Sequence, residues 1–334
     1  MHIEGGIKRA LVLRCGALGD LIYATSVIDA LRKEYGNDVL IDFICTPGTA
    51  KLFENDPRIN QVFPLKHKKL PIWLSPQKRA IIRHSHEHPY DLFISLEFGK
   101  QFKSLIQAIN ATHKTGMGIL PTDVDTSNIN RGEATKLYYR DIVGENCLAS
   151  AKPIVYGAPT ELNLPANAII IAPSNSHNQK KGLNYRAWPF GHWRELMHAL
   201  SDHPLIIVGA KGEEAFFDHL KPYPSNVVDL VGKLSIPALI TTVQNAQALI
   251  CTDSATGHIG AAVDTPTFVL MGPNNPITDS PYQSSSNAVY PISLRLPCSP
   301  CYKTELMKQC RDNVCMSQIT PDMVLKSLKS AAII

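Results

Sequence analysis

Short apolar runs alternate with amphipathic stretches along the whole chain. In the first half, the apolar runs that have the length of buried strands are Ala10–Leu13, Val39–Ile44, Gln61–Leu65, Asp91–Leu96 and His113–Gly118. Between the first two, apolar residues recur with helical spacing at Leu21, Ala24, Val27, Ile28 and Leu31. Continuous apolar strands separated by helices are typical of a parallel sheet that is covered on both faces.

The same pattern restarts in the second half. The strand candidates there are Ala168–Ala172, Leu205–Val208, Val227–Leu230, Ala248–Cys251 and Thr267–Met271. The helices that we expect between them are Pro189–Leu200, Glu213–Leu220, Ile236–Asn245 and Thr256–Val263. A proline-bracketed linker, Ala158–Pro165, separates the halves, and Thr320-Pro321 has the signature of a helix start.

We therefore predict an α/β protein with two doubly wound domains. Their expected bounds are 1–158 and 166–319, followed by a C-terminal helix in 320–334 that packs back on the N-terminal domain. In such sheets, ligands bind at the carboxyl ends of the strands, so loops at those ends are the places to look for chemistry.

Composition narrows the class of protein. The 334 residues suit two domains, and 44% apolar with 19% charged residues is normal for globular cores. No apolar run reaches the roughly 18–20 residues of a spanning helix. Arg14 and Asp20 interrupt the apolar stretch near the start, which argues against a signal peptide. Eight cysteines are too few for a disulfide scaffold, so we expect a soluble cytoplasmic protein with reduced thiols.

Positive charge is concentrated between Pro64 and His88. This segment has four histidines and one acid, Glu87, and its cations are Lys66, Lys68, Lys69, Lys78, Arg79 and Arg83. Such a segment suits anionic head groups, phosphorylated glycans or nucleic acid. A solvated basic helix and loop explains the composition equally well.

The turn after the first strand, Arg14–Leu21, is glycine-rich and opens a helix, which suits backbone approach to a ligand. It lacks the G-x-G-x-x-G dinucleotide fingerprint, although Asp42 lies where a ribose-binding acid would follow. Asp20 is either the N-cap of that helix or a general base that takes a proton from a sugar hydroxyl.

Three turns in the second half have the chemistry of a nucleotide site. Pro173–Ser176 leads through Lys180, Lys181 and Arg186 to Trp188, and these cations suit a diphosphate, with Trp188 as a core anchor. Val208–Glu214 offers a carboxylate for ribose hydroxyls or for the helix dipole. Thr252–His258 combines hydroxyls with a helix N-terminus, although a lone His258 is more often a core residue.

A cysteine segment follows these turns. Cys298 and Cys301 form a C-x₂-C pair, and Cys310 and Cys315 lie downstream with a wider spacing. The set is compatible with a structural zinc or iron site, and reduced thiols are the simpler interpretation.

Taken together, these residues resemble glycosyltransferase family 9, the bacterial heptosyltransferases of lipopolysaccharide core assembly. The resemblance covers nearly all of the chain, from Gly16–Asp20 to the cysteine segment and the final helix. Its specific part is the ordered combination of the Gly-Asp turn, Trp188-Pro189, Asp253–His258 and Gly272-Pro273.

The resemblance implies the GT-B fold, which has two Rossmann-like domains with the active site between them. It implies an ADP-heptose donor held mainly by the C-terminal domain, and a lipopolysaccharide core acceptor (Kdo or heptose) held by the N-terminal one. It also implies an inverting single displacement without a catalytic metal, at the inner membrane face and without nucleic acid as a partner.

Asp20 matches the family's proposed general base, and we expect Arg186 to stabilise the leaving diphosphate. The expected donor-binding residues are Ser174, Lys180, Lys181, Glu213, Asp253, Ser254, Ala255, Thr256, Gly257 and His258. The expected acceptor-binding residues are Gly19, Lys66, Lys68, Lys69, Lys78, Arg79 and Arg83. They would hold the acceptor's carboxylates and phosphates by electrostatic attraction rather than insertion.

Two positions depart from the family pattern. Arg186 stands where lysine is common, and Ala255 replaces a glycine of the Asp253–His258 loop, which questions close backbone approach to the donor. Three other functions are compatible with the sequence. They are a related enzyme with another nucleotide sugar or a protein acceptor, a non-catalytic nucleotide-sugar-binding scaffold, and a nicotinamide oxidoreductase.

Overall fold

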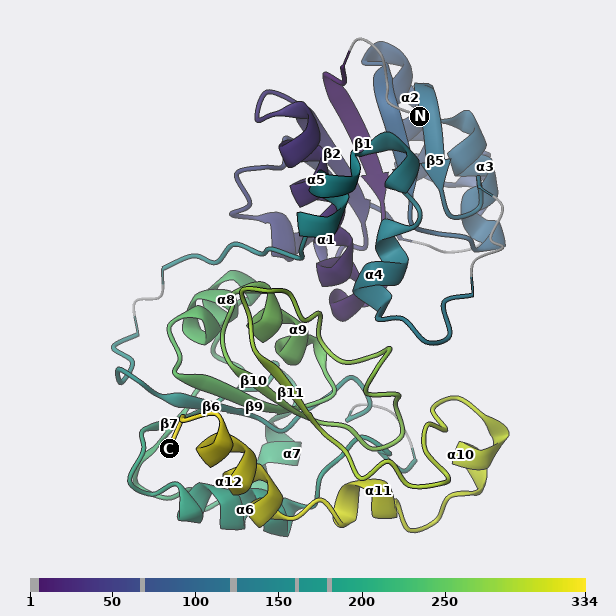
Figure 1. Cartoon of the computed structure of the whole chain (residues 1–334). Coiled ribbons are helices and arrows are strands. Elements are labelled where there is room, and N and C mark those ends of the chain that lie inside the picture. Colours follow the sequence, from purple (N-terminus) through teal and green to yellow (C-terminus); the bar gives the residue numbers. More distant parts are fainter. Residues whose placement is uncertain (1–5, 67–69, 121–124, 160–161, 179–181) are drawn as a thin grey trace. The chain divides into compact units, whose positions relative to one another are not determined.

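The computed structural model describes residues 6–66, 70–120, 125–159, 162–178 and 182–334. The chain forms two compact units, Met1–Tyr156 and Gly157–Ile334 (Figure 1). Lys68 and Lys69 of the expected acceptor set, and Lys180 and Lys181 of the expected donor set, lie outside the described residues.

The first unit contains a parallel sheet in the order β3-β2-β1-β4-β5. Its strands are β1 (Arg9–Leu13), β2 (Leu40–Cys45), β3 (Gln61–Pro64), β4 (Tyr90–Ser95) and β5 (Ala111–Gly116). Its α-helices are α1 (Leu18–Tyr35), α2 (Pro76–Glu87), α3 (Lys100–Ala108), α4 (Arg131–Lys136) and α5 (Glu145–Ser150). Short 3₁₀ turns are η1 (Ala50–Phe53), η2 (Ile72–Leu74) and η3 (Arg140–Ile142).

The second unit contains a parallel sheet in the order β11-β10-β9-β6-β7-β8. Its strands are β6 (Ile169–Ala172), β7 (Leu205–Ile207), β8 (Val227–Asp229), β9 (Ala248–Thr252), β10 (Thr267–Leu270) and β11 (Val289–Ile292). Its helices are α6 (Phe190–Ala199), α7 (Glu214–Asp218), α8 (Ile236–Gln244), α9 (Ala255–Ala262), α10 (Glu305–Gln309), α11 (Val314–Ser317) and α12 (Pro321–Ser330).

These elements confirm the predicted alternation of strands and helices, and the α/β fold class with it. The strand that the sequence did not reveal is β11, a short edge strand that contains Pro291. Proline cannot donate to a sheet ladder, so a run that contains it does not have the sequence of a central strand, and the sheet tolerates it here because β11 lies at an edge.

The last helix packs within the second unit. α12 contacts α6, β10 and β11, and its Val324 and Leu328 are buried in the core of that unit (Figure 1). From the sequence we expected this helix to pack back on the N-terminal domain. Its apolar face instead fills the sheet face beside α6, where a shared core of apolar side chains stabilises it.

Glycine 260 lets α9 lie directly on its sheet. A β-carbon added there would lie 2.3 Å from Thr267 Oγ1 and 2.8 Å from Leu249 Cδ2, both on buried strands. Gly191 of α6 has nothing within 4 Å of the same added atom. The two glycines are therefore a matched pair for testing how closely helix and sheet pack.

We expect Gly260→Ala to lower the stability of the second unit by about 1–3 kcal/mol, because the helix must move off the strands. Gly191→Ala relieves the entropic cost of a helical glycine and should stabilise by up to about 1 kcal/mol. Thermal unfolding of the two variants measures the difference. Equal melting temperatures would contradict the close packing of α9.

Candidate functional site

Both sheets reverse their strand order at one point. In the first unit this switch point lies between β1 and β4, and in the second it lies between β6 and β9. The loops that leave adjacent strands at a switch point turn to opposite faces, and a crevice opens between them where ligands of such sheets bind. Asp20 lies beside the first of these points, and Ser174, Asp253 and Ser254 lie beside the second.

At the first switch point, Asp20 is the third residue of α1 and not its N-cap. Its Oδ2 accepts the backbone N–H of Ala17, which occupies the cap position, at 3.2 Å. Its Oδ1 lies 3.3 Å from Arg14 Nη2 and 3.9 Å from Arg131 Nη1. The side chain is 30% exposed. From the third position of the helix, Asp20 therefore satisfies the N–H of the N-cap residue. It also presents a carboxylate to solvent, oriented by two guanidinium groups.

Glu97 also belongs to this cluster, and the sequence analysis missed it. The residue follows β4, and its Oε1 accepts the Cys15 N–H at 2.7 Å and lies 3.7 Å from Arg14 Nη1. Arg14 therefore links the two carboxylates across the switch point. The sequence did contain a signal for this residue, because Glu97 comes soon after a buried strand, as do Asp20 and Asp253.

Gly16 makes this arrangement possible. A β-carbon there would lie 2.8 Å from Asp20 Cβ and 2.9 Å from its Oδ2. Gly19, which the sequence analysis assigned to acceptor binding, is the second residue of α1 and directly precedes Asp20. Asp42, in contrast, is fully buried within β2, where it accepts from Tyr90 Oη at 2.6 Å and Asn60 Nδ2 at 2.7 Å. These partners explain Asp42 without a ribose, which removes the support for a nicotinamide enzyme.

The structure describes four cations of the basic segment, of which one is buried and three are exposed. Lys78 is only 2% exposed, and its Nζ donates to the carbonyls of Leu70 at 2.8 Å and Gln101 at 2.9 Å. Burial lowers the pKa of Lys78. The prediction that Lys78 binds an acceptor is therefore wrong, since it ties η2 to the start of α3. The exposed cations are Lys66, Arg79 and Arg83.

At the second switch point, Arg186 and Asp253 form an ion pair. Arg186 Nε lies 3.5 Å from Asp253 Oδ2, and its Nη1 donates to the Asp253 carbonyl at 3.2 Å. Asp253 directly follows β9 and is 6% exposed. The sequence analysis placed both residues in the donor site, and the structure brings them into contact.

The loops beside this pair contain buried polar atoms that lack a hydrogen-bond partner among the described residues. Asn175 Nδ2, Ser254 Oγ and Asn274 Oδ1 are buried and have no hydrogen-bond partner within the described ranges. The three residues follow the adjacent strands β6, β9 and β10, respectively. Since an unpaired buried polar group is costly, such atoms at one edge of a sheet indicate a polar ligand.

The loop from Asp253 to His258 leads into α9. Ser254 is the N-cap residue, and its hydroxyl makes no cap hydrogen bond. Ala255 is the first helical residue, and it does not have the positive φ that would require glycine. Thr256 and His258 are half-buried, whereas Gly257 is buried against Cys251 and Pro281. Gly257 thus serves close packing, and the helix N-terminus with Ser254 faces the edge of the sheet.

Two further expected residues lie at this edge. Ser174 follows β6, and its carbonyl accepts from Thr252 Oγ1 at 3.2 Å, which ties the ends of β6 and β9 together. Glu213 precedes α7, and its Oε2 accepts the Ala210 N–H at 2.8 Å. Its other carboxylate oxygen has no partner in the part of the chain that the structure describes. Trp188 is buried and donates to the Ile319 carbonyl, which confirms its role as a core anchor.

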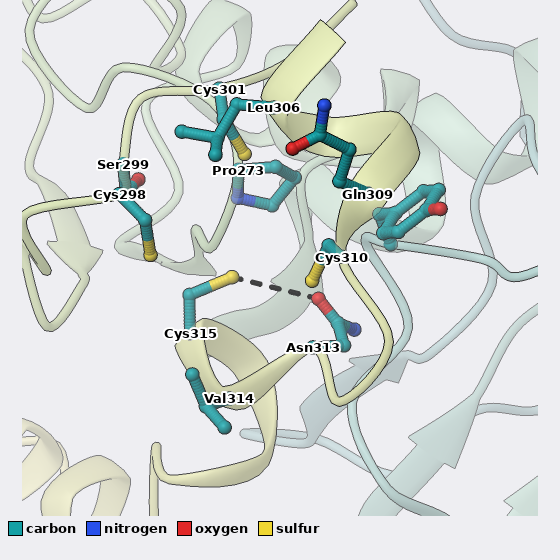
Figure 2. Close-up of a pocket in the computed structure, with 11 residues that line it drawn as sticks. Pro273, Cys298, Ser299, Cys301, Leu306, Gln309, Cys310, Asn313, Val314 and Cys315 are labelled. Atoms are coloured by element: carbon teal, nitrogen blue, oxygen red, sulfur yellow. Dashed lines mark hydrogen bonds between the residues drawn. The ribbon is translucent and has the colours of Figure 1, made fainter. Parts of the chain in front are cut away.

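The four cysteines of the C-terminal segment line one pocket of about 290 Å³ (Figure 2). Cys301 and Cys315 are buried, Cys310 is half-buried and Cys298 is exposed. Burial and the neighbouring thiols raise the pKa of Cys315 to about 11. Nevertheless, the described residues contain no group of three or more His, Cys, Asp or Glu side chains that could hold a metal ion. As they stand, the four thiols do not fit the tetrahedral site that their spacing suggested.

Known proteins resemble the chain over most of its length. Residues 148–311 match the model of glycosyltransferase family 9 (heptosyltransferase). The chain is 30% identical to lipopolysaccharide heptosyltransferase 1 of Escherichia coli K12 over 300 residues, which cover 80% of this chain and 89% of that protein. It is 22% identical to lipopolysaccharide heptosyltransferase 1 of Pseudomonas aeruginosa, covering 88% and 86%.

Solved structures share the fold. A glycosyltransferase family 9 protein of Veillonella parvula superposes with a TM-score of 0.80 at 17% identity, covering 99% of this chain and 98% of that one. Escherichia coli heptosyltransferase WaaC with ADP gives 0.69 at 17% identity, covering 96% and 99%. The iron-containing dodecameric glycosyltransferase TibC gives 0.56 at 13% identity, covering 98% and 77%. The two parallel α/β sheets are thus those of a GT-B fold, and the chain belongs to glycosyltransferase family 9, the heptosyltransferase family.

Proposed function

We propose that the protein transfers heptose from ADP-heptose to the inner core (Kdo or heptose) of lipopolysaccharide, with inversion and without a catalytic metal. The names of its relatives support the sugar and the acceptor. The buried polar atoms without partners at the ends of β6, β9 and β10 carry the donor assignment. A nucleotide diphosphate offers the many acceptors and donors that these atoms and Arg186 require.

On the donor side, Arg186 has the central role. Asp253 holds the Nε and Nη1 edge of the guanidinium, and Nη2 has no partner among the described residues. A guanidinium held in this way can pair with phosphate oxygens and stabilise the charge that grows on the leaving ADP. The N-terminus of α9, preceded by Ser254, adds backbone N–H groups for the same phosphates.

On the acceptor side, Asp20 acts as the general base. It takes the proton of the acceptor hydroxyl while that oxygen forms the new bond to the anomeric carbon, and the bond from this carbon to the ADP oxygen breaks. Attack opposite to the leaving group inverts the configuration. The two guanidinium groups beside Asp20, together with the Ala17 N–H, orient the carboxylate for this transfer.

Asp20→Asn separates the two roles of this side chain. The amide oxygen can still accept the Ala17 N–H, so helix α1 should keep its stability, but the amide cannot take a proton. We expect kcat to fall by about 10²- to 10⁴-fold with the Kd for ADP unchanged. The measurement is ADP release and product mass with ADP-heptose and a heptose-deficient core acceptor.

Asp20→Ala is the companion variant, which should lose both transfer and some thermal stability. Undiminished transfer by Asp20→Asn would leave Asp20 as a helix cap only. A wild-type protein that binds ADP and transfers nothing would point to another acceptor or to a scaffold, and competition with UDP and GDP would test the identity of the donor.

We also propose that transfer needs no metal. TibC, with its iron, shows that a protein of this fold can contain a metal, and Cys298, Cys301, Cys310 and Cys315 are the residues here that would have to hold one. Their present arrangement does not fit an ion, and all of the side chains assigned to the reaction are nitrogen and oxygen groups elsewhere. We expect transfer to continue at an unchanged rate in excess EDTA, and loss of turnover that Mg²⁺ restores would contradict this proposal.

Finally, we propose that the first unit meets its lipid-linked acceptor at the membrane face through the segment around α2. Three apolar side chains before this helix are exposed: Leu70, Trp73 (69% exposed) and Leu74. Arg79 lies beside them, because its Nη1 donates to the Trp73 carbonyl, and Arg83 follows one turn later. Cations that flank an exposed tryptophan fit the interface of an anionic bilayer.

Trp73 provides its own assay. The chain has three tryptophans, and the other two, Trp188 and Trp193, are buried. Vesicles rich in phosphatidylglycerol should therefore shift the emission of Trp73 to the blue, and Trp73→Phe should abolish the shift. Arg79→Gln should weaken binding about fivefold on anionic vesicles and not on neutral ones.

If Arg79→Gln weakens vesicle binding but Trp73 of the wild type shows no blue shift, the protein is attracted to the membrane surface without inserting. The charge pattern alone predicted this behaviour. Binding that neither variant changes would contradict this surface. None of the described helices has both the length and the apolar character needed to span a bilayer.

A further inference from the structure

The aromatic ring of Tyr302 lies against Arg186. The guanidinium carbon is 4.3 Å from the ring centroid, within the range of a stacked cation–π contact. Tyr302 comes from the cysteine segment, far along the chain from Arg186. The ring covers one side of a guanidinium whose Nε and Nη1 are directed at Asp253.

Tyr302 is itself held in place from two other loops. Its hydroxyl lies 2.9 Å from His177 Nε2, in the loop after β6, and the His177 N–H donates to Asn175 Oδ1. Its backbone N–H donates to the Pro273 carbonyl at 3.0 Å, in the loop after β10. Tyr302 is therefore connected to both loops that carry the unpaired atoms of Asn175 and Asn274.

The cysteine segment is fixed to the same edge of the sheet. Cys301 N–H shares the Pro273 carbonyl with Tyr302, and Ser299 Oγ donates to the Gly272 carbonyl at 2.6 Å. Tyr185, the neighbour of Arg186, lines the cysteine pocket together with Cys301. The segment thus contacts Arg186 through Tyr302 and packs beside its backbone through this pocket.

We propose that Tyr302 is a positioning residue for the donor site, which sets the plane of Arg186 so that its free edge meets the diphosphate. The physical reason lies in the two contacts of Arg186. The contacts of Nε and Nη1 with Asp253 hold one edge of the guanidinium but leave it free to tilt out of its plane, and the Tyr302 ring over its face restricts this tilt. A guanidinium whose movement is already restricted also binds phosphate more tightly, because less rotamer freedom is lost when its hydrogen bonds form.

This proposal gives the cysteine segment a function that does not need a metal. The thiol-lined pocket and the segment's hydrogen bonds to the carbonyls of Gly272 and Pro273 form the base from which Tyr302 projects. The proposal rests on the proposed nucleotide-diphosphate donor. It is tested by nucleotide binding alone, so that neither the acceptor nor Asp20 enters the measurement.

The test is a double-mutant cycle on the Kd for ADP, measured by calorimetry with the full chain. We expect Tyr302→Leu, which removes the ring, to raise this Kd by about 3- to 30-fold. Tyr302→Phe keeps the stacked ring and should stay within about threefold of the wild type. In an Arg186→Ala background, Tyr302→Leu should have no further effect, because the ring acts through the guanidinium.

Three outcomes would overturn the proposal. If Tyr302→Leu lowers the affinity for ADP equally in the wild-type and Arg186→Ala backgrounds, Tyr302 supports the fold in general and does not act through Arg186. A Tyr302→Phe variant as weak as Tyr302→Leu would assign the effect to the hydroxyl and His177. An unchanged Kd in Tyr302→Leu would remove the role altogether. Thermal unfolding accompanies each variant, and Tyr302→Gln replaces Tyr302→Leu if the latter does not fold.

Failure of the donor assignment gives a different result. A wild-type protein that binds none of ADP, UDP and GDP would refute the nucleotide donor, and the role of Tyr302 with it. A wild-type protein that binds ADP, combined with an additive cycle, refutes only the role of Tyr302.

Discussion

The parallel pairing of β9 with β6 on one side and β10 on the other determines where the unpaired polar groups of the second unit's candidate site lie. Parallel strands end at the same edge of their sheet, so the loops that carry Asn175, Asp253 and Asn274 emerge side by side. The same constraint places Arg14 and Glu97 together after β1 and β4 in the first unit. The polar chemistry of this enzyme is therefore concentrated where the strand order reverses, and the apolar strands behind it supply a rigid support.

Arginines hold carboxylates in both units, with different consequences. Arg14 binds Asp20 and Glu97 near the start of a helix, and the Asp20 carboxylate remains partly exposed. Arg186 binds an Asp253 that is nearly buried, and Arg186 is the more exposed of the two side chains, at 13% against 9%. One site thus presents an anion, which suits removal of a proton, and the other presents a cation, which suits a leaving diphosphate.

The cysteine segment shows why spacing alone is a weak guide to metal binding. Its four thiols line one pocket, as a metal site would require (Figure 2), but the described residues contain no group of three or more side chains arranged to hold a metal ion. Metal ligation depends on the direction of each Cβ–Sγ bond as well as on the distance along the chain. What the segment does supply in this structure is a fixed backbone beside Pro273 and an aromatic ring against Arg186.

The sequence by itself determined the alternation of strands and helices, the doubly wound class, and the loops that follow β1, β6 and β9 as sites of chemistry. These features follow from local periodicity and from turn residues, which a single chain displays directly. Only the tertiary structure decided which side chains meet. Lys78 and Arg79 are adjacent cations, yet one is buried against the start of α3 and the other is exposed, because successive helical residues face different neighbours. The contacts of Glu97 with Arg14, and of Tyr302 with Arg186, join residues distant in sequence, and their partners depend on the fold.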